Sequence, residues 1–462
     1  MRDVRGLEVS TRNARSLAAY ERAVDELHRY SGNPLATIDA ALAEDPGFVL
    51  GHCLKATLAV GATERSLEAM LREAVEAGEA HSGAATARER AHLAAARAWL
   101  ERDFDAALDR YARIAIEHPR DTLAVQTAHI AAFYLGRQLA LRDVVARALH
   151  AWDERVPGYG YLLGMYAFGL EENGDYARAE EVGRRAIELD PRDGWASHAV
   201  AHVMEMQTRL ADGVAWLTEG SRGWDADNAF VFHNFWHLAL YHLDLGDVAR
   251  VLELYDTRVR PHRSDVALEM IDASAMLWRL RLGGHDVGGR FEALADDWRS
   301  RIEDGYYVFN DVHALMAFLG AHREADAAAL VAAVERRAGE SGTNGRMIRE
   351  VGLPVCRALV AFDRGDFRTC VDALLPLRDV AVRFGGSNAQ RDVITQTLIE
   401  AALRGGDAAL GRALASERAR LRPGSPATWL VQARALDVAG AGGEAAQARD
   451  RALRLRARLL AA

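Results

Sequence analysis

Residues 101–121 read ERDFDAALDRYARIAIEHPRD, and residues 172–193 repeat the same outline as ENGDYARAEEVGRRAIELDPRD. Each stretch opens on a turn, continues with an aromatic residue (Phe104 or Tyr176) and places an alanine three residues further on. Each also has a proline two residues before its end. Because proline cannot continue a helix and a small residue lets two helices approach closely, the outline predicts one helix of a packed pair.

The outline recurs more faintly further along the chain, at residues 245–261, 364–377 and 405–423. Helical periodicity of the apolar residues extends through most of the remaining sequence, whereas strand-like alternation is scarce. A single helix pair cannot bury its apolar face, so successive pairs must stack on one another. We therefore predict an all-α fold, an α-solenoid of tetratricopeptide-like helix pairs that is strongly curved or closed on itself.

The sequence contains no Ser/Gly-rich linker or low-complexity run that would mark a domain boundary. The length of 462 residues alone would suggest about three domains, but repeat architectures do not follow that rule. We expect a single helical-repeat domain over residues 1–462. Its clearest repeats span 88–261 and 351–423, its irregular N-terminal helices 14–84 and its C-terminal capping helices 427–461.

The composition narrows the classes of partner. The chain has 57 Lys+Arg against 66 Asp+Glu and a formal net charge of −9, which argues against a nucleic-acid partner. Three cysteines without a CxxC motif indicate a reducing compartment. The start of the chain carries no apolar signal segment, and no apolar run reaches the roughly 18 residues that span a bilayer. These features predict a cytoplasmic protein that does not associate with membranes.

Glycine-rich segments do not indicate a nucleotide cofactor. GGHDVGG (283–289) follows no strand and has the wrong spacing for a dinucleotide-binding loop, so we interpret it as a connection between helices. Gly440–Gly443 is interpreted in the same way. No GxSxG or P-loop motif is present. His52 and Cys53 are neighbours in sequence and point apart on a helix, which argues against a Cys–His dyad.

Five longer motifs go beyond the generic repeat. They read RGLEVST (5–11), DPGFVLGH (45–52), WASHAVAHVMEMQ (195–207), HNFWHLALYHLDLGD (233–247) and GGSNAQRDV (385–393). In this order and spacing, they make nearly the whole chain resemble the tetratricopeptide repeat protein 38 family. The resemblance implies a soluble, single-domain helical fold and no particular reaction.

Two histidine pairs stand out in these motifs. His198 and His202 are four residues apart with Glu205 shortly after them, and His233 and His237 repeat the spacing. At 100° per residue, each pair lies on a narrow stripe of its helix. By the resemblance to tetratricopeptide repeats, both helices are first helices of a repeat and line a concave surface. Neighbouring helices pack about 10 Å apart, so these five candidate catalytic residues are expected to converge in a channel.

Further residues are predicted to face the channel or its mouth on the same helical count. The predicted ligand-binding residues are Trp195, Trp236, Tyr161, Glu171, Asp244, His313, Arg391, Gln396 and Glu400. Arg391 belongs to GGSNAQRDV, where Ser387 could cap a helix whose amides meet an anion. The alternative is an ordinary capped helix whose arginine pairs with a carboxylate.

Three interpretations of the histidines stay open. They could form a polar binding or catalytic channel without a metal, or act as structural residues. They could also hold a divalent metal ion such as Zn, Fe or Mn through His198, His202, Glu205, His233 and His237. The glutamate of an HExxH motif is missing, because Ala199 follows His198.

The sequence thus predicts a channel lined by His, Glu and aromatic residues that binds, and could transform, a polar small molecule. One alternative is a scaffold that holds a peptide or partner helix in the groove, and a second is a metal-dependent enzyme. Peptide-binding grooves of this fold display Lys, Arg and Asn clamps, which this channel lacks. The sequence leaves the substrate, the presence of catalysis and the oligomeric state open.

Overall fold

The computed structural model describes residues 1–224 and 227–461. Within these residues the regular structure is helical, and the sole extended pairing is an isolated bridge between Arg2 and Glu8. The predicted all-α class is confirmed. No helix in the described residues is long and apolar enough to cross a membrane.

The chain divides into two compact units, and the division passes through helix α11 after Val200. The first unit comprises Met1–Val200, Gly223–Val231 and Ser341–Arg346, and the second comprises Ala201–Arg222, Phe232–Glu340 and Met347–Ala462. The prediction of one continuous domain stays a prediction, as does that of a curved or closed solenoid.

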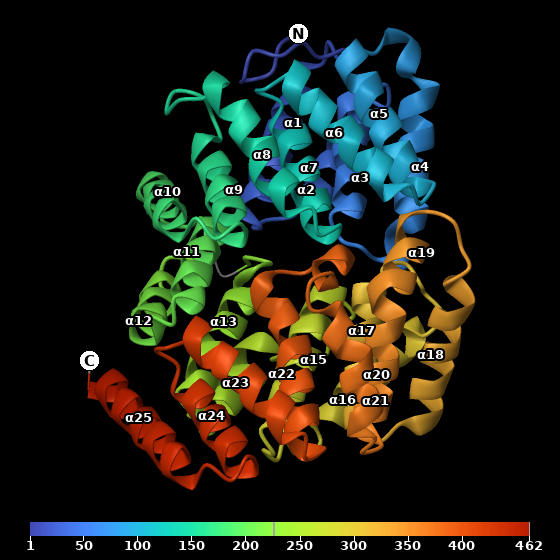
Figure 1. Ribbon diagram of the computed structural model, residues 1–462. Helices are drawn as coiled ribbons and strands as arrows, with labels where there is room; N and C mark the ends of the chain where they lie inside the picture. Colours follow the sequence, from blue (N-terminus) through green and yellow to red (C-terminus); the bar gives the residue numbers. More distant parts are fainter. Residues whose placement is uncertain (225–226, 462) are drawn as a thin grey trace. The chain divides into compact units, whose positions relative to one another are not determined.

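The first unit is built from the helices drawn in blue to green in Figure 1. They are α1 (Ala14–Arg29), α2 (Pro34–Glu44), α3 (Val49–Val60), α4 (Glu68–Ala80), α5 (Ala87–Leu100), α6 (Phe104–Glu117), α7 (Thr122–Tyr134), α8 (Gln138–Ala148), α9 (Tyr159–Glu172), α10 (Tyr176–Leu189) and the start of α11 (Gly194–Met206).

The second unit continues from the end of α11 to the red C-terminal helix of Figure 1. Its helices are α12 (Leu210–Gly220), α13 (Val231–Asp244), α14 (Val248–Leu254), α15 (Ala267–Leu282), α16 (Arg290–Trp298), α17 (Val308–Gly320), α18 (Glu324–Arg337), the end of α19 (Thr343–Met347), α20 (Leu353–Asp363), α21 (Phe367–Leu374), α22 (Asn388–Arg404), α23 (Ala408–Leu421), α24 (Pro426–Val438) and α25 (Gly442–Ala461).

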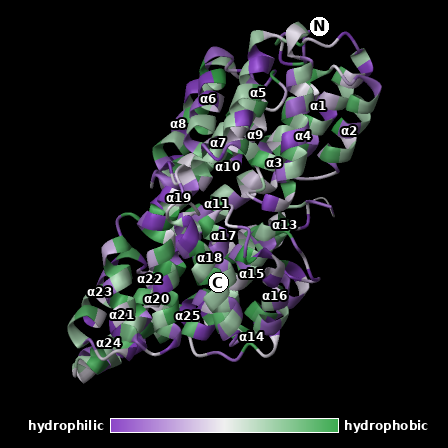
Figure 2. Ribbon diagram, turned by 90° about the vertical axis from the view of Figure 1, so that its right-hand side faces the viewer, coloured by the Kyte–Doolittle hydropathy of each residue, from purple (hydrophilic) through white to green (hydrophobic). Residues whose placement is uncertain are grey.

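Helices that follow one another in sequence pack together, as α5 does on α6, α9 on α10 and α24 on α25. The alanines of the two quoted repeats, Ala107 and Ala179, are completely buried at these contacts. Apolar and polar ribbon segments alternate along the helices (Figure 2), as expected when each helix buries one face. The helix pairs in both units are of the predicted tetratricopeptide-like kind.

The turns between helices have a shared cause. Gly246 and Gly406 adopt left-handed φ angles of 74° and 72°, which cost other residues more than glycine. The aspartates that follow them, Asp247 and Asp407, each accept a hydrogen bond from the backbone amide three residues further on. This N-cap satisfies an amide that the first turn would otherwise leave open, so the Gly-Asp pair ends one helix and starts the next.

Two glycine-rich segments predicted as loops have different outcomes. Residues 283–289 do connect α15 to α16, which confirms that prediction. The prediction for Gly440–Gly443 is wrong in its second half, because α25 begins at Gly442. Nothing lies within 4 Å of the position of a Cβ at either Gly442 or Gly443, and both tolerate the helical conformation.

Helix α15 is buried along most of its length beside the site. Every residue from Met270 to Leu280 is buried. The indole of Trp278 donates a hydrogen bond of 3.0 Å to Thr397 on α22, which fixes α15 against α22. Polar residues of α15 are therefore held rigidly inside the second unit.

Candidate functional site

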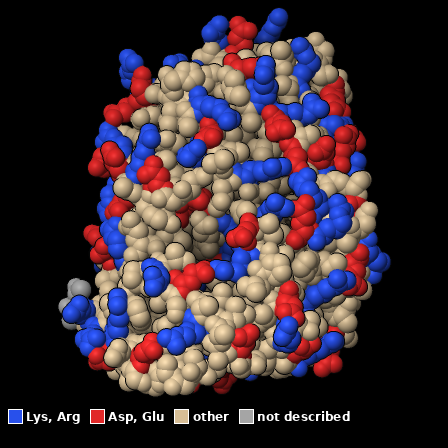
Figure 3. Space-filling view, viewed as in Figure 1, with Lys and Arg blue, Asp and Glu red and all other residues tan. Residues whose placement is uncertain are grey.

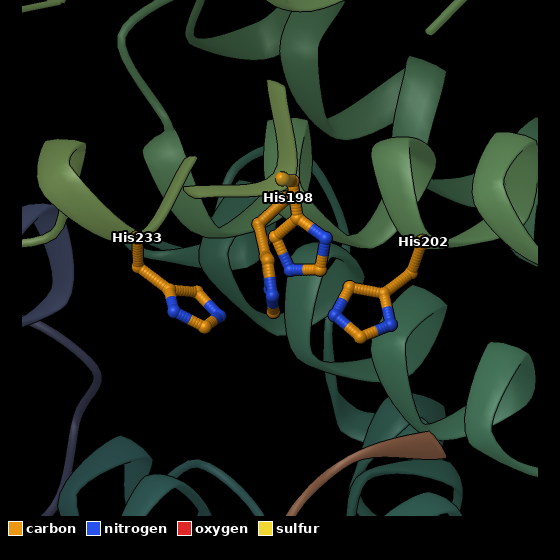
Figure 4. A group of neighbouring side chains, drawn as sticks. His198, His202 and His233 are labelled. Carbon is orange, nitrogen blue, oxygen red and sulfur yellow. The ribbon is translucent and has the colours of Figure 1, made fainter. Parts of the chain in front are cut away.

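Three of the predicted histidines meet inside the second unit. His202 comes from α11 and His233 from α13 (Figure 4). His237 lies one turn after His233 on α13. Each of the three rings offers one nitrogen, and these three nitrogens lie within 4.8 Å of one another. All three side chains are buried. The ring centroid of His237 is 4.3 Å from that of His202 and 4.9 Å from that of His233.

Local packing sets this arrangement. Trp236 stacks on His233 with ring centroids 5.4 Å apart and meets the ring of His237 edge-on. The hydroxyl of Tyr241 donates a 2.6 Å hydrogen bond to the carbonyl of Ala201, which ties α13 to α11. These contacts hold the histidine-bearing faces of the two helices toward each other.

Two buried carboxylates orient two of the rings. Nδ1 of His233 lies 2.6 Å from Oδ2 of Asp272 on α15, and Nδ1 of His237 lies 2.9 Å from Oε2 of Glu205 on α11. A carboxylate that accepts from Nδ1 places the proton there and leaves Nε2 as the basic nitrogen. Both rings thus have a defined tautomer.

The environment keeps His237 neutral. Burial, together with the nearby His202, His233 and Arg279, lowers its pKa well below the usual value for histidine. Burial raises the pKa of Asp272, and the nearby His233 acts in the opposite direction and lowers it. A neutral imidazole can in general accept a proton or ligate a metal ion through the lone pair of its unprotonated nitrogen.

Glu205 connects the histidines to a group of arginines. Its other oxygen, Oε1, lies 3.4 Å from Arg422 on α23, and Arg422 lies 3.7 Å from Asp392 on α22. Asp392 also forms a two-pronged pair with Arg418 at 2.6 and 2.9 Å. Although burial raises the pKa of Asp392, Arg418 and Arg422 hold it below its usual range.

A cavity of about 190 Å³ lies in the second unit, with Glu205 in its wall. Its charged and amide side chains come from six helices: Glu205, Asp244, Arg279, Asp392, Gln396, Glu400, Arg418, Arg422 and Arg434. Leu240, Ile399 and Val431 form part of the apolar wall. The cavity therefore offers both charged and apolar surface to one small molecule.

Arg279 is the unusual residue of this wall. It is 3% exposed, donates to the carbonyls of Ala389 and Ala275 at 2.7 and 3.1 Å, and lies 5.3 Å from the ring centroid of Trp236. Among the described residues, no carboxylate forms an ion pair with it. Burial lowers its pKa to about 10, so the guanidinium still carries its positive charge at neutral pH.

The predicted residues Asp244, Gln396 and Glu400 also line the cavity. Glu400 pairs with Arg434 at 2.7 and 3.0 Å, and Gln396 donates to Asp392 at 2.7 Å. Asp244 accepts from Ser425, and burial raises its pKa although Arg422 and Ser425 lower it.

Other predicted residues lie in the first unit. Tyr161 stacks on His28 at 5.2 Å and donates to Asp25 at 3.1 Å. Tyr161 and Trp195 border a pocket of only about 10 Å³, and Glu171 is completely buried. The pocket is too small for a ligand larger than water.

His198 is assigned to the first unit, one turn before His202 on the same helix. Its ring packs 5.1–5.3 Å from the ring centroids of Phe168, Trp195 and Phe230. The single channel predicted to join Trp195 and Tyr161 with all four histidines stays a prediction.

His313 and Arg391 have local roles. Nδ1 of His313 donates to the carbonyl of Phe309, four residues earlier on α17, and burial lowers its pKa to about 4. Arg391 folds back on its own loop, where it donates to the carbonyl of Gly386 and to Asn388. Ser387 caps α22 as predicted.

Sequence reasoning missed Asp272 and Arg279. Each is a charged residue inside an otherwise apolar helical stretch, MIDASAMLWRL (270–280). That is an available signal, because a charge in a fully buried helix is costly unless it has a partner. The partners themselves lie far away in the sequence and could not be inferred from it.

Charged side chains of both signs lie on the one face of the surface that Figure 3 draws. On the face drawn in Figure 3, Lys and Arg side chains are interspersed with Asp and Glu. Many form ion pairs, such as Arg336 with Glu303 at 2.9 Å. The prediction that nucleic acid is not a partner stays a prediction.

Comparison with known proteins adds similarity at the level of the fold. No family model matches the chain. The structure of the human IFIT1 dimer with m7Gppp-AAAA has 13% identity and a TM-score of 0.42, over 97% of this chain and 96% of that chain. Yeast Tom70 has 13% identity and a TM-score of 0.33 over 96% of both chains. The TPR domain of P58(IPK) has 11% identity and a TM-score of 0.22, over 81% and 98%.

Proposed function

We propose that the second unit binds a small polar molecule carrying an acidic group in the cavity beside Glu205. The observation that carries this proposal is Arg279, a buried cation in the cavity wall whose partners are backbone carbonyls and an indole ring. Asp392 and Glu205 act on Arg279 electrostatically, but neither forms an ion pair with it. An acidic group in the cavity would give the buried guanidinium a direct charged partner.

The size of the cavity limits the ligand. A cavity of about 150 Å³ holds one benzene molecule, so the volume of about 190 Å³ fits a small metabolite and not a helix or an extended peptide. This favours a small molecule over the alternative of a peptide scaffold for this site. An aliphatic or aromatic portion of the ligand would meet Leu240, Ile399 and Val431.

The charges of the wall favour an acid over a base. Asp392 already pairs with Arg418, and Glu400 already pairs with Arg434. Their negative charge is thus largely compensated within the wall. Glu205 pairs with Arg422, and burial raises the pKa of Asp244, which accepts from Ser425. Arg279 has no such carboxylate partner among the described residues and remains to pair with the ligand, with Gln396 and Thr428 nearby in the wall.

A chemical role for the pair of Glu205 and His237 fits the same site. Glu205 faces the cavity and bonds to Nδ1 of His237. The pair could hold or move a proton at a ligand that contacts Glu205, which is general acid–base chemistry. Catalysis is a second step of the proposal, and binding is testable without it.

Thermal denaturation with a panel of small carboxylates and phosphates tests the proposal. A ligand at 100 times its Kd stabilises the folded state by about 2.7 kcal/mol, enough for a clear rise in Tm. We expect one class of acid to raise the Tm of the wild type but not of Arg279→Gln. The matched control is Arg281→Gln, because Arg281 lies on the same helix but pairs with Asp363 and not with the cavity. Equal stabilisation of Arg279→Gln and wild type would contradict the proposal.

A further inference from the structure

We infer that His202, His233 and His237 form a binding site for one divalent transition-metal ion of the zinc type. None of the three rings belongs to the cavity wall, so the inference does not rest on the proposed function. The three nitrogens come from two helices, α11 and α13, which the hydrogen bond of Tyr241 to Ala201 ties together.

The distances suit a single ion. Each Zn–N bond measures about 2.1 Å, so two nitrogens on one ion lie at most about 4.2 Å apart. The three ring nitrogens already lie within 4.8 Å of one another. A pair at the 4.8 Å limit would have to close by about 0.6 Å or more to share one ion.

The carboxylates supply a second, independent observation. Histidines that ligate a metal through one nitrogen usually donate the other N–H to a carboxylate or carbonyl, which fixes the ring and makes it a better ligand. His233 has this arrangement with Asp272, and His237 has it with Glu205. Two of the three rings therefore have the carboxylate partner that metal-binding histidines usually have.

The charge of the site also favours a cation. Asp272 and Glu205 are 0% and 4% exposed and lie against two of the rings. Glu205 also pairs with Arg422, and Asp272 bonds to His233 and lies in the field of Arg279. A divalent ion on the rings would place further positive charge beside these two buried carboxylates.

The ligand set selects the class of metal. Imidazole nitrogens suit Zn²⁺, Co²⁺, Ni²⁺, Cu²⁺ and Fe²⁺, whereas Mg²⁺ and Ca²⁺ require oxygen ligands. Three histidines leave one position of a tetrahedral ion for another ligand. Glu205 places the site beside the cavity, because it bonds to a ligand histidine and faces the cavity.

Titration with Co²⁺ tests the site in the full chain. The protein is stripped with a chelator, dialysed and titrated with Co²⁺, whose visible absorption reports nitrogen coordination, and bound metal is counted by elemental analysis. We expect stoichiometric binding by the wild type and loss of binding in His202→Ala, His233→Ala and His237→Ala. His242→Ala is the matched control, because His242 lies on α13 but pairs with Asp247.

Conservative variants separate a lost site from a lost fold. Asp272→Asn keeps the shape of the side chain and should weaken Co²⁺ binding by about 10- to 100-fold, as loss of an outer carboxylate does. Circular dichroism checks that each variant is folded. No Co²⁺ binding by the wild type, or wild-type affinity in folded His233→Ala and His237→Ala, would overturn the inference.

Discussion

Glu205 accepts a hydrogen bond of 2.9 Å from Nδ1 of His237 and at the same time lies in the wall of the cavity. One carboxylate thus belongs to two sites, the histidine cluster and the arginine-lined cavity. Its second oxygen faces Arg422 at 3.4 Å. A change at Glu205 should therefore affect both sites.

The pair of Glu205 and Arg422 is expected to contribute to stability. Both side chains are largely buried, and Glu205→Gln removes a charged hydrogen-bond partner while keeping the shape. We predict a loss of about 1–3 kcal/mol in the free energy of unfolding, measured by urea denaturation. Glu253→Gln is the control, since Glu253 forms a surface pair with Arg250 and should cost less than about 1 kcal/mol. Equal losses in the two variants would contradict the prediction.

The approach of α12 to α13 requires a glycine. A Cβ on Gly213 would lie 2.3 Å from the ring of Tyr241, which holds α13 to α11. Gly213→Ala should lower the free energy of unfolding by about 1–3 kcal/mol through overpacking. Gly443→Ala meets nothing within 4 Å and should raise it by up to about 1 kcal/mol. Thermal denaturation of both variants gives the comparison, and a neutral Gly213→Ala would contradict the close packing.

The pH dependence of stability should carry the signature of His313. Its pKa is lowered to about 4 by burial, from an ordinary value near 6.5. As pH falls through this window, the unfolded chain takes up a proton that the folded chain does not, so acidification destabilises the fold. The loss attributable to His313 should approach about 1.4 kcal/mol per pH unit.

The variant His313→Asn isolates this contribution. Its free energy of unfolding should fall less steeply than that of the wild type between pH 6.5 and 4. Asp311 provides a comparison of opposite sign, because burial raises its pKa to about 7 and its uptake of a proton in the folded state stabilises the fold on acidification. Parallel pH profiles for His313→Asn and the wild type would contradict the assignment.

The cysteines should be unreactive in the folded protein. Cys53, Cys356 and Cys370 are all buried, and burial raises the pKa of the Cys370 thiol to about 12. Since the thiolate is the reactive form, a thiol reagent such as DTNB should modify the chain only after unfolding in guanidinium. Rapid modification of the native protein would show that one of these thiols is accessible.

Much of this molecule could be predicted from the periodicity of its sequence. The outline of 101–121 predicts helix pairs, and the spacing of His233 and His237 places both on one face of α13. Periodicity tells which side of its own helix a residue occupies, but not which helix lies opposite. Asp272 and Arg279 therefore escaped notice, because α15 meets α13 through tertiary packing alone.

The predicted channel also shows where such reasoning reaches its limit. Tyr161 was predicted beside the histidines from its helical position, yet it stacks on His28 and bonds to Asp25. Arg391 was predicted to meet an anion or a carboxylate, and its bonds to Gly386 and Asn388 are made within its own loop. Contacts of this kind depend on loop conformation and on packing between distant helices, which a single sequence does not encode in a readable pattern.

We propose that the cation of Arg279 recognises the acidic group of a ligand in the cavity. Isothermal titration calorimetry with the acid that best stabilises the wild type tests it most directly, on the wild type, Arg279→Gln and Arg281→Gln. We expect saturable binding of the acid to the wild type and to Arg281→Gln. The affinity of Arg279→Gln should be at least about tenfold weaker, because a charged hydrogen bond is lost. Equal affinity in all three proteins would contradict it.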